Sequence, residues 1–127
     1  PMEKLESYKK VRMLETMKLD EETGLKLVSR YNKHREVMKG FEKGRAELMD
    51  KLDELVRNNA NETEYQKVFD NLLEYETKTA EARSQYLNEL KEILTNKQIA
   101  EYLIFERSFA RDIRDIVRDV QRERMKK

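Results

Sequence analysis

Five side chains between positions 35 and 49 alternate positive charge with soft apolar groups. They are Arg35, Met38, Phe41, Arg45 and Met49. Methionine is flexible and polarisable, and arginine lays its aliphatic stem on apolar surfaces while its guanidinium stays in water. The set predicts a surface that attracts another protein chain electrostatically and then holds its apolar segments loosely. On spacing alone, however, an ordinary dimer core is the favoured interpretation of its Met and Phe residues.

Metal and catalytic chemistry have few candidates. The chain has one histidine, His34, and no cysteine, whereas zinc and copper sites usually recruit several nitrogen or sulfur ligands. An exposed helical histidine is therefore the favoured interpretation, and a weak metal site combining His34 with carboxylates is the alternative. The sequence contains no Gly-rich phosphate loop and no nucleophile-elbow motif. We expect no enzyme activity and no cofactor.

Composition indicates the elements that must position these residues. Of 127 residues, 42% are charged and 38% are hydrophobic, with one Pro and three Gly. Because so few residues favour turns, the sequence predicts an all-α chain. Because so many residues are charged, each helix should have only a narrow apolar stripe, which packs against another helix of the chain or against a second copy. We expect one domain over 1–127. The expected helices, two of them long, cover residues 3–18, 20–57, 61–93 and 95–124.

Helix-start signals support these boundaries. Asn61 follows the Asn-rich turn and predicts the cap of the third helix. Thr95 is a good N-cap for the fourth helix, with Gln98 as its partner in a capping box. Leu94 and Ile99 occupy the two positions of a hydrophobic staple around that box. The stretch 94–98 therefore predicts the end of one helix and the start of the next.

A weaker copy of this element stands at 19–23. Leu19 and Asp20 correspond to the start of the later stretch, and Asp20 keeps the capping chemistry of threonine, while Thr23 stands where the later stretch has glutamine. With its two stretches of this kind, the chain resembles the Spy/CpxP family, whose members carry two Leu-Thr-x-x-Gln motifs. The stretch 94–98 matches the motif, and the stretch 19–23 departs from it.

The resemblance implies a four-helix protomer that forms an elongated, antiparallel, cradle-like homodimer in the periplasm. It implies an ATP-independent chaperone or envelope-stress protein that binds unfolded or partly folded client proteins. Two alternatives stay open: a heavy-metal sensor or resistance protein of the same fold, and a plain helical scaffold or adaptor. An export signal upstream of Pro1 would support the periplasmic location.

Charge patterning argues against nucleic acid and membranes as partners. The formal net charge is +1, and the arginine stripe of the C-terminal segment runs beside a parallel acidic stripe. The favoured interpretation is a solvated face, or a clamp on the acidic third helix, rather than a nucleic-acid contact. No apolar run approaches the length of a membrane span, so we expect no membrane insertion. The expected buried stripe of the fourth helix comprises Ile99, Tyr102, Leu103, Phe109, Ile113, Ile116, Val117 and Val120.

Gly40 and Gly44 have the spacing of close helix contacts. Each should cost the helix roughly 1 kcal/mol relative to alanine. We therefore expect either a close neighbour at this point or a bend in the helix.

Overall fold

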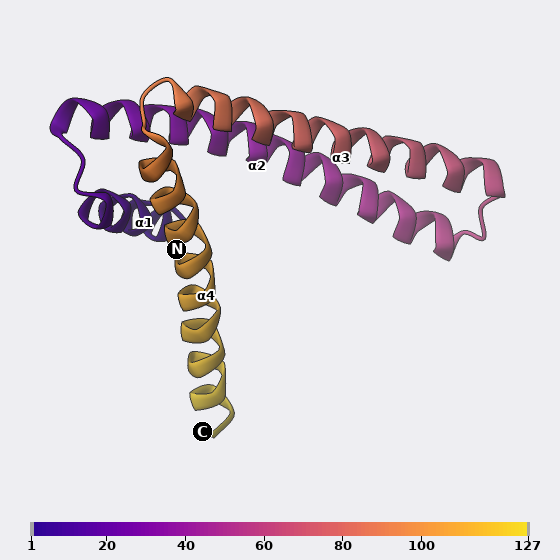
Figure 1. The fold of residues 1–127 in the computed structure, drawn as a ribbon. Helices are drawn as coiled ribbons and strands as arrows, with labels where there is room; N and C mark the ends of the chain where they lie inside the picture. The colour runs from indigo at the N-terminus through magenta and orange to yellow at the C-terminus, as the bar shows by residue number, and fades with distance from the viewer. Residues whose placement is uncertain (1, 127) are drawn as a thin grey trace. The chain divides into compact units, whose positions relative to one another are not determined.

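The computed structural model describes residues 2–126, which form four helices joined by short turns (Figure 1). They are α1 (Met2–Met17), α2 (Glu21–Arg57), α3 (Glu62–Lys91) and α4 (Asn96–Lys126). Residues 2–126 contain no strand, so the predicted all-α fold with four helices is confirmed. The helix ends lie within two residues of the predicted boundaries.

The chain, for which the sequence predicts one domain, divides into two units. The first joins the N-terminal segment ending at Val28 to the C-terminal segment beginning at Lys91, and the second is Ser29–Leu90. Helix α2 contributes to both units, because the division falls after its second turn.

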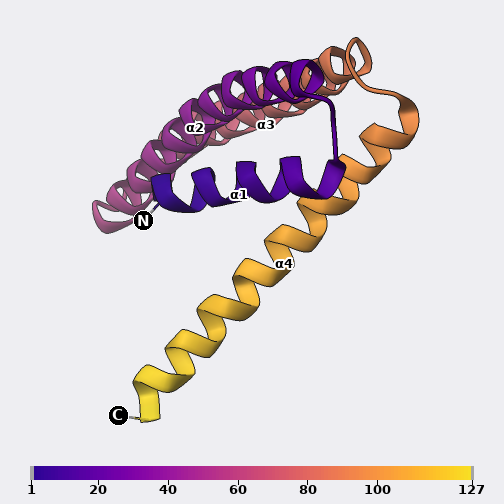
Figure 2. The ribbon, with the colours of Figure 1, turned by 90° about the vertical axis from the view of Figure 1, so that its left-hand side faces the viewer.

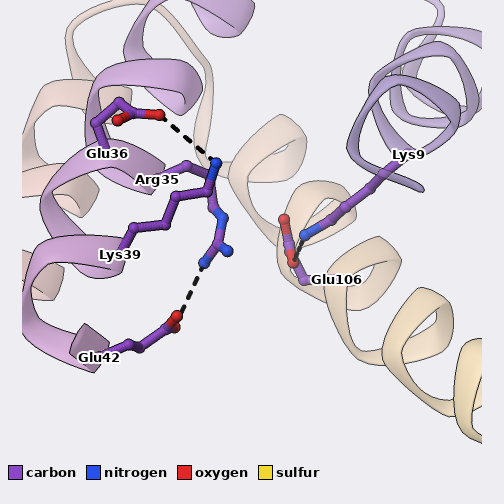
Figure 3. Close-up of polar contacts among 6 residues, drawn as sticks. All are labelled: Lys9, Arg35, Glu36, Lys39, Glu42 and Glu106. Carbon is purple, nitrogen blue, oxygen red and sulfur yellow. Dashed lines mark hydrogen bonds and ion pairs between the residues drawn. The ribbon is translucent and has the colours of Figure 1, made fainter. Parts of the chain in front are cut away.

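In the first unit, α1 packs across α4 (Figure 2). The Tyr8 and Phe109 rings lie 6.0 Å apart, and Lys9 Nζ lies 2.7 Å from Glu106 Oε2 (Figure 3). This ion pair is largely shielded from water, which makes it stronger than the exposed pairs along the helices. The buried side chains of the unit are Met13, Met17, Leu27, Leu94, Ile99, Tyr102 and Phe105.

The turn between α3 and α4 forms the predicted capping box. The backbone N–H of Gln98 donates to Thr95 Oγ1 at 3.1 Å, and the backbone N–H of Thr95 donates to Gln98 Oε1 at 2.9 Å. Leu94 and Ile99, the predicted staple residues, are both buried. Two otherwise unpaired backbone donors are thereby satisfied, which fixes where α4 begins.

The corresponding stretch at the start of α2 is less elaborate. The backbone carbonyl of Asp20 accepts a hydrogen bond from Gly24 N–H at 2.9 Å, which places Asp20 at the N-cap position. No hydrogen bond of the Asp20 carboxylate occurs within residues 2–126. Leu19 and Thr23 are half-buried. A Cβ on Gly24 would lie 3.3 Å from the Leu14 side chain, so glycine allows α1 and α2 to approach closely here.

In the second unit, α2 and α3 form an antiparallel hairpin, with the two helices side by side in both views (Figures 1 and 2). Asn59 adopts the left-handed conformation at φ 50°, and Ala60 N–H donates to Leu55 O at 3.0 Å, which is a Schellman-type helix end. Glu64 N–H donates to Asn61 Oδ1 at 3.2 Å, so Asn61 caps α3 as predicted.

The register of the hairpin follows from counting residues outward from this turn. His34 stacks on Tyr86 with ring centroids 4.1 Å apart, and the Tyr75 ring lies over Gly44. Each pair is nearly equidistant from the turn in sequence. The buried side chains of the unit are Tyr31, Met38, Leu55, Val68, Tyr86 and Leu90.

The predicted stripe of α4 is buried only in its first half. Ile99 and Tyr102 are buried, and Phe109 and Ile113 are half-buried. The prediction was wrong for the remaining members, Leu103, Ile116, Val117 and Val120, which are exposed in this chain. The contacts of α1 with α4 lie at Glu106 and Phe109, and the groove between the two helices ends at Ile116, so Val117 and Val120 lie beyond it. Leu103, in the first half of α4, is exposed as well.

Candidate functional site

A groove of about 340 Å³ opens between α2 and α3 in the second unit. Its α2 wall contains three of the five residues predicted to hold a client: Met38, Phe41 and Arg45. The complete lining is Met38, Phe41, Glu42, Arg45, Tyr75, Glu76, Thr79 and Arg83. Arg35 and Met49, the other two predicted residues, do not line the groove.

Helical periodicity explains why these residues meet. Met38, Glu42 and Arg45 are spaced by four and three residues on α2, and Glu76, Thr79 and Arg83 by three and four on α3. Residues at such spacings share one face of a helix. The groove therefore lies between one face of each helix of the hairpin.

The floor of the groove is aromatic. Phe41 and Tyr75 meet edge to face, with ring centroids 6.2 Å apart and an interplanar angle of 76°. A Cβ on Gly44 would lie 2.7 Å from Tyr75 Cε1 and closer still to its hydroxyl, so only glycine admits the ring in this position. Gly40, in contrast, faces open space. The expected close contact thus forms at one glycine of the pair and not at the other.

The faces that form the groove continue toward the turn as exposed apolar side chains. Met49 and Val56 extend the row on α2, and Phe69 and Leu73 extend the row on α3, at helical spacings of three, four and seven. These four side chains are between 43% and 63% exposed. We call the groove lining together with these four residues the groove face.

The other side of the hairpin is polar. A pocket of about 330 Å³ there is lined by Gly44, Glu47, Leu48, Asn71, Glu74, Tyr75 and Lys78. A hydrogen bond from Lys78 to the Glu74 carboxylate, 3.0 Å away, raises the pKa of Lys78. Apart from Val37, every exposed large apolar side chain of the second unit belongs to the groove face. The hairpin therefore has one apolar side and one polar side.

Positive charge on the groove face comes from both helices. Neither Arg45 nor Arg83 forms an ion pair within residues 2–126. Glu42 lies 3.7 Å from Arg35, whose side chain is only 24% exposed (Figure 3). Arg35 thus packs within the protein, whereas Arg45 and Arg83 line the groove.

His34, the weak metal candidate, packs against an aromatic ring. Its imidazole lies parallel to the Tyr86 ring, with an angle of 4° between the planes, and is half-buried. The interpretation as a simple exposed histidine is therefore incomplete. Within the described part of the chain, no three His, Cys, Asp or Glu residues are grouped so that they could hold a metal ion.

Sequence reasoning missed the α3 half of the groove. Tyr75, Thr79 and Arg83 lie in a segment that looks polar, and its exposed apolar neighbours Phe69 and Leu73 look like ordinary core. The available signal was the turn at 58–61, because folding the sequence back at this point sets residues 38–45 opposite residues 75–83.

Comparisons of the chain with protein-family models, with curated proteins and with solved structures give no match. None of the helices within residues 2–126 combines the length and the apolar character that crossing a bilayer requires.

Proposed function

We propose that this protein is an ATP-independent chaperone of the Spy/CpxP type, and that it binds unfolded or partly folded proteins on the groove face. The observation that supports this most is the row of four exposed apolar side chains next to a groove with two unpaired arginines. Exposed apolar side chains that gather on one side of a protein are characteristic of interaction sites. The motif at 94–98 supports the family and the periplasmic location.

The chemistry of the groove face suits loose binding of many sequences. Burial of apolar surface contributes about 25 cal/mol per Å², so each partly exposed side chain contributes little and several act together. Met49, which is exposed, adapts to side chains of different shape. Contacts that are individually weak can be released as the client buries its own apolar groups, which requires no nucleotide.

Arg45 and Arg83 provide the first attraction. Exposed charges act over roughly 8–10 Å at physiological salt, and they raise the rate at which an oppositely charged chain arrives. We therefore expect acidic segments with apolar residues to bind best, and we expect binding to weaken as salt rises. We also propose that the working form is a homodimer, since the exposed stripe of α4 provides a further apolar surface.

The test is an aggregation assay with a client that unfolds on reduction, without nucleotide. The paired substitution Arg45→Glu with Arg83→Glu should reduce protection, because it reverses the two positive charges of the groove and leaves its lining, which also contains Glu42 and Glu76, acidic. The control is Lys43→Glu with Lys67→Glu, which changes net charge equally at two exposed lysines outside the groove. Helicity and oligomeric state should be the same in all three proteins.

The outcomes separate the alternatives. Equal protection by the two paired variants would contradict binding at the groove face. If several clients aggregate at the same rate with and without the protein, the chaperone proposal fails. A sharp rise in Tm with divalent metal would then support the metal-sensor alternative through ligand linkage. If the protein does not slow client aggregation and divalent metal does not raise its Tm, the helical-scaffold alternative is favoured.

A further inference from the structure

A second groove, of about 380 Å³, opens between α1 and α4 in the first unit. Its lining includes the rings of Phe105 and Phe109, and it includes three large side chains that are each more than half exposed, Tyr8, Ile104 and Ile116. A volume of this size is within the range of pockets that bind ligands. The groove face lies in the other unit, so the proposed function gives this second groove no occupant.

Two carboxylates of the groove project from one face of α4. Glu101 and Asp112 are eleven residues apart, which is close to three full turns, so they share a face at a separation of about 16.5 Å. Neither carboxylate forms an ion pair in the part of the chain that the structure describes. Arg12, a basic residue of the lining, lies 3.4 Å from Glu15 on its own helix. The groove therefore has two negative charges that no basic residue of the chain neutralises.

The surface between the two carboxylates is mostly apolar. Phe105 and Ser108 lie on the line that joins them, and Ile104 and Phe109 lie on either side of that line. The groove lining does not include the basic residues of this part of α4, which are Arg107, Arg111 and Arg114. A complementary occupant therefore has an apolar centre and a positive charge at each end.

We propose that this groove binds a basic amphipathic helix of a partner protein, with one lysine or arginine beside Glu101 and another beside Asp112. In such a helix, residues i and i+11 share a face about 16.5 Å apart, which matches the separation of the two carboxylates. Apolar side chains at i+4, i+7 and i+8 then face Ile104 and the aromatic rings, as in other complexes in which a helix lies in an apolar groove.

An extended segment does not fit the same two charges. At 3.2–3.4 Å per residue, about five residues of a strand span 16.5 Å. Residues i and i+5 of a strand point to opposite faces, so only one of the two basic side chains would reach the groove. The spacing of Glu101 and Asp112 therefore selects a helical occupant.

This site goes beyond the proposed function, because the groove face attracts acidic segments whereas the groove between α1 and α4 attracts basic ones. The first test uses two fluorescent, side-chain-stapled helical peptides of identical Leu and Lys composition, each of about 18 residues. One has its lysines at i and i+11 beside a leucine row, and the other has the second lysine at i+9, on the opposite side of the helix. By fluorescence anisotropy, the first should bind about two- to fivefold more tightly, the size of one exposed ion pair. Equal affinities would overturn the matched spacing.

The second test removes the two charges of the groove. Glu101→Gln with Asp112→Asn is compared with Glu3→Gln with Glu21→Gln, which removes two exposed carboxylates of the same unit outside the groove. The first variant should bind the i, i+11 peptide about two- to tenfold more weakly, as expected for two exposed ion pairs, and the second should bind it like the parent. Equal affinities for the two variants would contradict binding at this groove.

The third test concerns the apolar surface. Ile104→Ser is compared with Leu25→Ser, because both side chains are exposed in the first unit, at 55% and 66%, and only Ile104 lines the groove. We expect Ile104→Ser to weaken peptide binding about fivefold, because less apolar surface is buried, and Leu25→Ser to leave it unchanged. If neither peptide binds, and Ile104→Ser instead lowers the mass of the protein alone in sedimentation equilibrium, a second copy occupies the groove and the proposal is wrong.

Discussion

Gly40 and Gly44 should respond in opposite directions to the same substitution. Both lie in the interior of α2, four residues apart, and replacing glycine with alanine in a helix interior gains about 1 kcal/mol through reduced backbone freedom. At Gly40 a new methyl group meets nothing within 4 Å. Gly40→Ala should therefore raise the free energy of unfolding by about 1 kcal/mol.

At Gly44 the methyl group competes with Tyr75. The ring carbon Cε1 is 2.7 Å from the position of the new Cβ, so the ring must leave its place. Its edge-to-face contact with Phe41 contributes about 0.5–1.5 kcal/mol beyond area burial. Exposing part of the ring costs about 1 kcal/mol more. Set against the helical gain, Gly44→Ala should lower the free energy of unfolding by about 1 kcal/mol.

The assay is urea unfolding of both variants followed by circular dichroism. The expected gap between them is about 2 kcal/mol, and in a Tyr75→Ala background Gly44→Ala should instead stabilise by about 1 kcal/mol, because the obstacle is gone. Equal stabilisation at both glycines in the parent chain would refute the packing of Tyr75 on Gly44. A concentration-dependent loss of stability in Gly40→Ala would show that a second copy approaches there.

Two further predictions concern the first unit. Thr95→Ala should lower the free energy of unfolding, measured with urea, by about 1 kcal/mol. Gln98→Ala should lower it less in the Thr95→Ala background than in the parent, because the two residues form one reciprocal cap. Full additivity of the two losses would contradict that cap. Lys9→Ala should lower the free energy of unfolding, measured by heat or urea, by about 1–2 kcal/mol, because it leaves the shielded Glu106 carboxylate without its cation. Lys9→Arg should retain most of that stability, and an equal loss in both variants would contradict the ion pair.

Local signals in the sequence were sufficient for the helix boundaries. A capping box depends on residues three apart, so Thr95 and Gln98 identify it without knowledge of the rest of the fold. The paucity of Pro and Gly likewise predicts the all-α class. Asn61 and its turn also follow from short-range chemistry.

Tertiary neighbours were harder to predict, because a helical stripe does not say what covers it. The α4 stripe looks uniform from Ile99 to Val120, yet α1 crosses only its first half. Met38, Phe41 and Arg45 share a face that periodicity identifies, whereas Arg83 enters the site only through the register of the hairpin. The burial of Arg35 depends on its neighbours and has no signature in its own segment.

The most direct test of binding at the groove face is site-specific photo-cross-linking to an unfolded protein whose cysteines have been reduced and alkylated. A photoreactive phenylalanine analogue is placed at Phe69, on the groove face, and in a second variant at Lys78, on the polar side of the hairpin. We predict strong cross-links to the client from position 69 that fall at high salt, and weak ones from position 78. Equal labelling from both positions, or stronger labelling from position 78, would contradict the proposal.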